Sequence, residues 1–137
     1  MAEQAEQPCK VLVVDDHGDT ADLTSRLLSY QGYEVRVANG YQEAIEAARA
    51  ARFDVMVCDV GLGDGDGCDL LAEVRAMYEV RAVALTGYGM KADRARCERA
   101  GFGHFLLKPV SLEDLKAAVD SASDGLPCAD VERGVSL

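Results

Sequence analysis

The sequence predicts an α/β fold: a doubly wound, five-stranded parallel sheet with helices on both faces. Apolar runs of strand length alternate with amphipathic, helix-like stretches from one end of the chain to the other. Two of these runs, residues 9–14 and 53–58, are almost continuously hydrophobic, which is typical of parallel strands buried on both faces. Five strand–helix units in succession require right-handed crossovers within one open sheet. We expect the strand order 2-1-3-4-5.

Five segments are predicted to be strands. In chain order they are residues 9–14, 33–38, 53–58, 82–86 and 104–107. The second segment, Tyr33-Glu-Val-Arg-Val-Ala38, alternates polar and apolar side chains. An alternating strand has one wet face, so we expect this segment at an edge of the sheet.

Five further segments place apolar residues at helical spacing and are predicted to be helices. They are residues 20–31, 41–51, 66–78, 90–100 and 112–123. Gly32 is a plausible C-terminal cap for the first of them. Ser111 is the expected N-cap of the last, with Asp114 three residues later, in a near capping box. The fourth helix has the weakest apolar face, since its apolar positions are mostly alanine.

The bulk composition predicts one soluble domain. We expect the domain at residues 9–123, between a flexible N-terminus at 1–8 and a C-terminal tail at 124–137. The formal charge of −10 argues against binding to nucleic acid and to anionic membranes. No apolar run approaches the roughly 20 residues of a membrane span, and the N-terminus lacks the features of a signal peptide. We therefore expect a cytoplasmic protein.

The cysteines and histidines suggest no metal site of their own. The chain has five cysteines, an odd number without a C-x-x-C pair: Cys9, Cys58, Cys68, Cys97 and Cys128. We therefore expect reduced thiols, with neither a disulfide framework nor a zinc site. Cys58, inside a predicted strand, is expected to be a small core residue. His17 and His104 have no ligand partners at helical spacing and are expected to be structural or solvent-facing.

Charged side chains follow three of the predicted strands at the point where each strand ends. Asp15 and Asp16 follow the first strand, Asp59 follows the third, and Lys108 follows the fifth. Ligands bind outside the carboxyl ends of such strands, so we expect these side chains to converge. Clustered carboxylates repel unless a cation neutralises them, and Mg²⁺ suits oxygen ligands and a phosphoryl group. Asp59, alone at its strand end, is the candidate nucleophile.

The fourth predicted strand ends at Thr86, whose hydroxyl can hydrogen-bond a phosphoryl oxygen. Lys108 could neutralise the remaining phosphoryl charge. Pro109 forces a turn after it, and the Lys108–Pro109 bond is the kind of peptide bond that can be cis. Tyr88, close to Thr86, could screen the site from water or be an exposed loop aromatic.

Residues 9–122 resemble the receiver domain of two-component response regulators, a family with the flavodoxin-like (βα)5 fold. The matching motifs are Val-Val-Asp-Asp at 13–16, Asp59, Asp66-Gly67, Leu85-Thr86-Gly87 and Leu107-Lys108-Pro109. Any one of these motifs is weak, but together they are highly specific. The stretches 84–89 and 100–109 are most similar to receivers of hybrid histidine kinases.

The resemblance implies a signalling switch. Asp59 would accept a phosphoryl group from a phosphohistidine on a histidine kinase or histidine phosphotransfer protein, and a downstream protein target would bind the altered surface. Asp16, Asp59 and the backbone carbonyl of Gly61 would hold Mg²⁺, with Asp15 reaching it through water. The domain would catalyse its own phosphorylation and dephosphorylation, and it would not be a turnover enzyme on other substrates.

The resemblance also implies how the signal spreads, and the sequence departs from the family pattern at two places. Thr86 and Lys108 would bind the phosphoryl oxygens, and Phe105 occupies the position of the switching aromatic. That position often holds tyrosine, so a hydrogen bond from its hydroxyl is absent here. Gly63 stands where the family usually has proline, and the glycines around it predict an unusually flexible loop.

The site residues disfavour two other functions. A hydrolase of the haloacid dehalogenase type needs its nucleophile in an Asp-x-Asp motif on the first strand, whereas Asp15 and Asp16 are adjacent. A degenerate receiver that no longer takes phosphate would lack a required residue, and every one is present. The sequence leaves open whether the chain is a free-standing regulator or part of a larger kinase.

Overall fold

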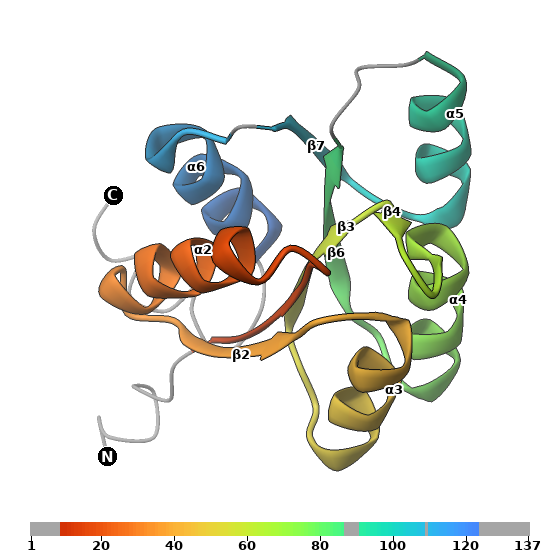
Figure 1. The fold of residues 1–137 in the computed structure, drawn as a ribbon, viewed down its shortest axis with the longest axis horizontal. Helices are drawn as coiled ribbons and strands as arrows, with labels where there is room; N and C mark the ends of the chain where they lie inside the picture. The colour runs from red at the N-terminus through yellow and green to blue at the C-terminus, as the bar shows by residue number, and fades with distance from the viewer. Residues whose placement is uncertain (1–8, 87–90, 109, 124–137) are drawn as a thin grey trace.

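The computed structural model describes residues 9–86, 91–108 and 110–123, and the side chains of 91–94 are not described. The predictions for the two chain ends, for Tyr88 and for the Lys108–Pro109 peptide bond therefore lie outside the described residues. Figure 1 shows a twisted sheet between two layers of helices. No helix in the described part of the chain is long and apolar enough to cross a membrane.

The main sheet confirms the predicted fold class and strand order. Its strands are β1 (Lys10–Val14), β2 (Glu34–Ala38), β3 (Val55–Asp59), β6 (Arg81–Thr86) and β7 (His104–Leu107). They lie in the order β2-β1-β3-β6-β7, and every neighbouring pair is parallel. Val13 pairs with Val57 across β1 and β3, and Asp59 pairs with Leu85 across β3 and β6. This register brings the carboxyl ends of the central strands to one edge of the sheet.

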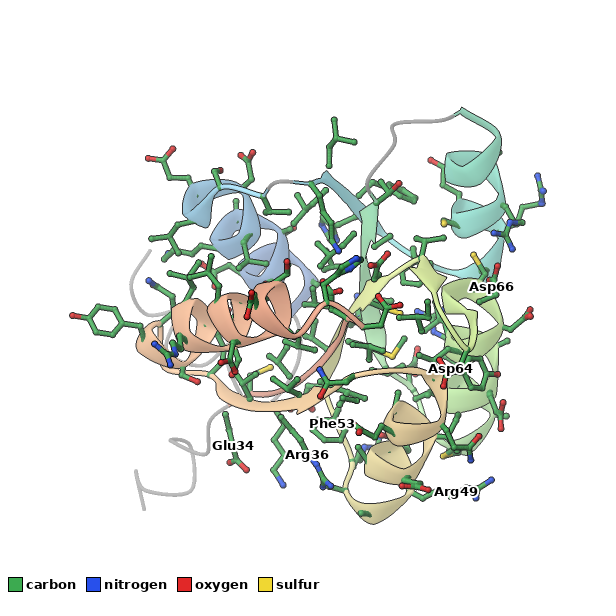
Figure 2. The ribbon with its side chains drawn as sticks, in the orientation of Figure 1. Glu34, Arg36, Arg49, Phe53, Asp64 and Asp66 are labelled. Carbon is green, nitrogen blue, oxygen red and sulfur yellow. The ribbon has the colours of Figure 1, made fainter. Side chains whose placement is uncertain are left out.

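The edge strand behaves as its alternating sequence predicted. Glu34 and Arg36 of β2 are exposed, while Val35 and Val37 are partly buried against the core. Figure 2 shows Glu34 and Arg36 pointing away from the sheet. The polar face of β2 therefore keeps one surface of the sheet edge in water.

The described helices match the predicted segments to within a few residues at each end. They are α2 (Gly18–Tyr30), α3 (Tyr41–Ala50), α4 (Gly67–Met77), α5 (Lys91–Ala100) and α6 (Leu112–Ser123). Gly32 has a φ of +102°, and its N–H donates to the carbonyl of Ser29, so a glycine ends α2 as predicted. The Ser111 hydroxyl accepts the Asp114 N–H at 3.1 Å, which confirms the predicted cap of α6.

The core has two halves, one on each face of the sheet. Alternate residues of a strand point to opposite faces, so Val13 and Val57 belong to one half and Leu12 and Met56 to the other. Helices α2 and α6 cover the first half, and α3, α4 and α5 cover the second (Figure 1). Cys58 is completely buried in the second half, as expected.

A small second sheet was not predicted. Strands β4 (Gly61–Leu62) and β5 (Gly65–Asp66) form a short antiparallel ribbon directly after β3. A Cβ atom at Gly67 would lie 2.8 Å from the carbonyl oxygen of Asp59, so the chain passes too close to β3 for a side chain. Strands of two residues are too short to show a periodic pattern, so only a glycine-rich loop was predicted here.

The buried face of α4 should contribute strongly to stability. Leu71 is fully buried between α4 and the sheet, whereas Leu23 on α2 is 58% exposed. Leu71→Ala should lower the free energy of unfolding by about 3 kcal/mol, because it removes apolar contacts and leaves a cavity. Leu23→Ala is the matched control and should change it by less than about 0.5 kcal/mol. Urea denaturation of both variants tests this, and equal losses would contradict the described burial.

Candidate functional site

The predicted convergence of charged residues is present at the carboxyl ends of β1, β3 and β7. Asp15 follows β1 and is fully buried, and Asp59 is the last residue of β3 and is 6% exposed. The ammonium nitrogen of Lys108 lies 2.9 Å from Asp15 Oδ2 and 2.9 Å from Asp59 Oδ2. One cation therefore joins two nearly desolvated carboxylates.

Lys108 remains charged at neutral pH in this position. Burial alone would lower its pKa, but hydrogen bonds and charge attraction from Asp59 and Asp15 outweigh burial and raise the pKa above the ordinary 10.5. A raised pKa means that the folded state holds the proton more tightly than the unfolded chain. The stabilisation from this ammonium is complete below pH 10.5 and is lost only as the pH rises above it.

Asp16 contacts the turn between β4 and β5. Its side chain is 29% exposed, and its Oδ2 accepts a hydrogen bond of 2.8 Å from the backbone N–H of Gly63. A proline at this position has no N–H to donate, so the departure at Gly63 supplies a contact that the usual family residue could not make. Gly63 therefore helps to fix the more exposed member of the aspartate pair.

His17 is a site residue that the sequence analysis missed. Its Nδ1 lies 3.2 Å from Asp15 Oδ1, 3.3 Å from Asp16 Oδ1 and 3.9 Å from Asp59 Oδ2. The side chain is 69% exposed, so the expectation that it faces solvent is correct, but it also covers the carboxylate cluster. Its position directly after the aspartate pair was the available signal.

The acid cluster has the donor set of a divalent cation site. One ligand atom from each of Asp15, Asp16, His17 and Asp59 lies within 4.8 Å of the others. Carboxylate oxygens are the ligands that Mg²⁺ prefers, and a cation would relieve the repulsion among the three acids. The residues present therefore fit the predicted metal.

Asp59 lies in a pocket of about 580 Å³ whose lining includes the predicted site residues Gly61, Thr86 and Lys108. Its lining residues are His17, Asp59, Val60, Gly61, Leu62, Gly65, Asp66, Thr86, Arg96 and Lys108. The backbone N–H of Gly61 donates to Asp59 Oδ1 at 3.1 Å, which orients the carboxylate. Thr86 ends β6, and its carbonyl accepts the Lys108 N–H at 2.8 Å, so these two predicted phosphoryl ligands are neighbours.

Phe105 lies on β7, the strand next to the one that ends at Thr86. It is partly buried and pairs in register with Ala84 on β6, two residues before Thr86. Its ring packs against the half of the core under α3, α4 and α5. The structure thus places the predicted switching aromatic on the strand next to Thr86.

Asp66 and Arg96 both line the pocket of Asp59. Asp66 caps α4 by accepting the N–H of Cys68 at 2.7 Å, and Arg96 of α5 lies 2.7 Å from its other oxygen. Burial would raise the pKa of Asp66, but the hydrogen bonds from Arg96 and the backbone outweigh it and lower the pKa. Figure 2 shows Asp66 beside α4, below α5.

Asp64 of the same ribbon holds α3 in place. Its two carboxylate oxygens accept the backbone N–H groups of Tyr41, at 2.8 Å, and Gln42, at 3.3 Å. These bonds lower the pKa of Asp64 and cap the helix from a distant segment, since the residue before the helix is Gly40. The ribbon is therefore tied to α3, α4 and α5.

Residues 11–120 match the family model of the response regulator receiver domain. The chain belongs to this family. It is 30% identical over 113 residues to the transcriptional regulatory protein ZraR of Escherichia coli K12, covering 82% of this chain and 26% of ZraR. It is 37% identical over 103 residues to an uncharacterised 14.6 kDa protein of Leptolyngbya boryana, covering 73% and 79% of the two chains.

Solved structures of other proteins support the same family membership. The chemotaxis protein CheY4 of Vibrio cholerae aligns with a TM-score of 0.80 and 29% identity, covering 84% of this chain and 98% of CheY4. Receiver domains are signalling domains of two-component systems and not turnover enzymes. The chain spans about a quarter of the length of ZraR, so the activities of that whole protein do not transfer to it.

Removal of the Lys108 charge should destabilise the metal-free protein. Lys108→Met leaves Asp15 and Asp59 without their cation, and the free energy of unfolding at neutral pH should fall by about 3 kcal/mol. Lys116→Met is the matched control, because Lys116 pairs with Asp120 at 3.0 Å on the exposed side of α6 and should lose less than about 0.5 kcal/mol. Adding Asp59→Asn to Lys108→Met should restore most of the loss. Urea denaturation in a chelator measures all three, and a harmless Lys108→Met would contradict the charge balance.

Proposed function

We propose that this receiver domain is a phosphorylation-dependent switch in which Asp59 accepts a phosphoryl group from a phosphohistidine. The observation that carries the proposal is the position of Asp59, which lies on a pocket wall 2.9 Å from Lys108 and beside Asp15 and Asp16. A lone carboxylate with a cation and two further acids is suited to nucleophilic attack on a phosphoryl group next to a metal.

The transfer follows from the groups in the pocket. A carboxylate oxygen of Asp59 forms a bond to phosphorus while the phosphorus–nitrogen bond breaks, and the leaving imidazole keeps the electron pair and takes up a proton. Lys108 neutralises one phosphoryl oxygen, and the Thr86 hydroxyl donates a hydrogen bond to another. Asp16, Asp59 and the Gly61 carbonyl would hold Mg²⁺, with Asp15 reaching it through water. The bound ion supplies further neutralisation of the transferred charge.

The same groups give a route for the signal. Thr86 reaches a phosphoryl oxygen by moving toward Asp59, and Phe105 then fills the space that Thr86 vacates. Phe105 has no hydroxyl, so it acts through packing alone. The inward ring reshapes the face formed by α5, β7 and α6, which is the surface for a downstream protein target.

The family and the net charge support a proposal for the phosphodonor and for the location of the protein. We propose a histidine kinase or a histidine phosphotransfer protein as the donor. The net charge of −10 favours neither nucleic acid nor an anionic membrane as a partner, and we propose a cytoplasmic location. Dephosphorylation would occur at the same site, by water attack on the acyl phosphate.

Phosphorylation can be tested directly with a small donor. Acetyl phosphate and Mg²⁺ should add one phosphoryl group to the protein, since the site supplies positioning and charge without the kinase. Asp59→Asn should abolish this mass increase, and a chelator should reduce it at least about tenfold. Asp69→Asn, which changes an exposed acid on α4, is the matched control and should be labelled normally.

The outcome separates three functions. Labelling that survives Asp59→Asn would refute the assignment of the acceptor. A protein that is never labelled would be a degenerate receiver, and steady turnover of phosphomonoesters would indicate a hydrolase.

The route of the signal can be tested by hydrogen exchange. Beryllofluoride, a phosphoryl mimic, should change amide protection in residues 86–108 much more than in residues 34–50. Thr86→Ala should still be phosphorylated on Asp59, because it keeps the nucleophile and the metal ligands, but it should lose most of this change. Changes spread evenly over the domain, or confined to residues 60–67, would contradict the route through Thr86 and Phe105.

A further inference from the structure

Two cysteines that are far apart in the sequence meet between α4 and α5. The sulfur atoms of Cys68 and Cys97 lie 3.5 Å apart, and both residues are buried, at 6% and 2% exposure. The nearby Cys58 is engaged elsewhere, because its thiol donates to the carbonyl of Asp59 at 3.2 Å. The two helices lie side by side on the same face of the sheet (Figure 1).

The thiol contact is a buried contact at the α4–α5 junction. Cys97 is the only buried side chain among those described on α5, which are residues 95–100. Its neighbour Arg96 makes the exposed part of the junction, through the ion pair of 2.7 Å with Asp66. Both Asp66 and Arg96 line the pocket of Asp59, so this junction connects the pocket to α5.

We propose that Cys68 and Cys97 form a reversible disulfide when the protein meets a peroxide, and that this bond locks α5 to α4. A disulfide needs the sulfurs at about 2.05 Å, so they must approach by about 1.5 Å. The contact lies between two helices and not within one, and the bond would therefore fix their relative position.

The reaction balances with hydrogen peroxide as the oxidant. One thiolate attacks the peroxide, the O–O bond breaks, and a sulfenic acid and one water form after proton transfer. The second thiol then attacks the sulfenic sulfur, the S–O bond breaks, and a second water leaves as the S–S bond forms. The two thiols lose two electrons in total, and the peroxide gains them.

The buried environment of the two thiols slows this reaction in the packed protein. Burial and the neighbouring Cys97 raise the pKa of the Cys68 thiol to about 12, so little reactive thiolate exists while the helices are packed. Oxidation therefore begins when α5 moves away from α4. The disulfide that then forms fixes α5 to α4. A dithiol reductant reverses the bond by thiol–disulfide exchange.

Peptide mapping of the oxidised full chain tests the bond. After treatment with hydrogen peroxide, the intact protein should lose the mass of two hydrogen atoms, and digestion without reductant should give one species that joins the peptides of Cys68 and Cys97. Cys68→Ser and Cys97→Ser should each abolish it, while Cys58→Ala, the matched control, should leave it intact. The wild-type map decides the matter even if a variant folds poorly. Unpaired oxidation, pairing with another cysteine, or persistent thiols would overturn the proposal.

A second measurement tests the lock. Amide exchange in residues 91–100 should slow at least about tenfold on oxidation and should recover with dithiothreitol. The effect on signalling rests on the function proposed above: beryllofluoride should change exchange in α5 of the reduced protein and not of the oxidised protein. Failure of acetyl phosphate to label the reduced protein would refute that function and leave the disulfide map unaffected. A mapped disulfide without slower exchange would overturn the lock.

Discussion

The ammonium of Lys108 lies between Asp15 and Asp59, and neither carboxylate has much contact with water. Two desolvated acids at adjacent strand ends repel each other, and a single cation converts this repulsion into two attractions. The contact is possible only because β1 and β3 are neighbours and β7 ends at the same edge of the sheet. The strand order and the charge balance of the site therefore depend on each other.

The positive and negative charges of the site do not cancel. Three carboxylates stand against one ammonium, so the cluster keeps a negative charge that a divalent cation can neutralise. The two adjacent aspartates have different partners. The buried Asp15 forms an ion pair with Lys108, and the more exposed Asp16 accepts a hydrogen bond from the N–H of Gly63. A phosphoryl group on Asp59 would add negative charge, and its ligands would have to come from Lys108, Thr86 and the metal. On the function proposed above, phosphorylation of Asp59 would therefore act on Thr86 at the end of β6.

Local patterns predicted those parts of the molecule that depend on local sequence. Continuous apolar runs predicted β1 and β3. The acids after these runs predicted the carboxylate cluster, because a residue that directly follows a strand must lie at the end of that strand. The β4–β5 ribbon was not predicted, because strands of two residues are too short to show an alternating pattern of polar and apolar side chains. The pairing of Cys68 with Cys97 depends on how α4 packs on α5, and no spacing between residues 29 apart in the chain reveals such packing. His17 faces solvent as predicted, but its contacts with Asp15 and Asp16 come from neighbours on its own loop, which helical spacing does not reveal.

The two helices on either side of β7 are anchored very differently. Helix α6 buries Leu115, Ala118, Val119 and Ala122, whereas α5 buries Cys97 alone among the side chains described at 95–100. Loss of apolar contact costs roughly 25 cal/mol per Å², so displacement of α5 is far less costly than displacement of α6. On the function proposed above, a switch that repacks Phe105 on β7 would therefore move α5 before α6. The weakness of its apolar face, already visible in the sequence, gives the helix its freedom to respond, and it also explains how one thiol contact could control it.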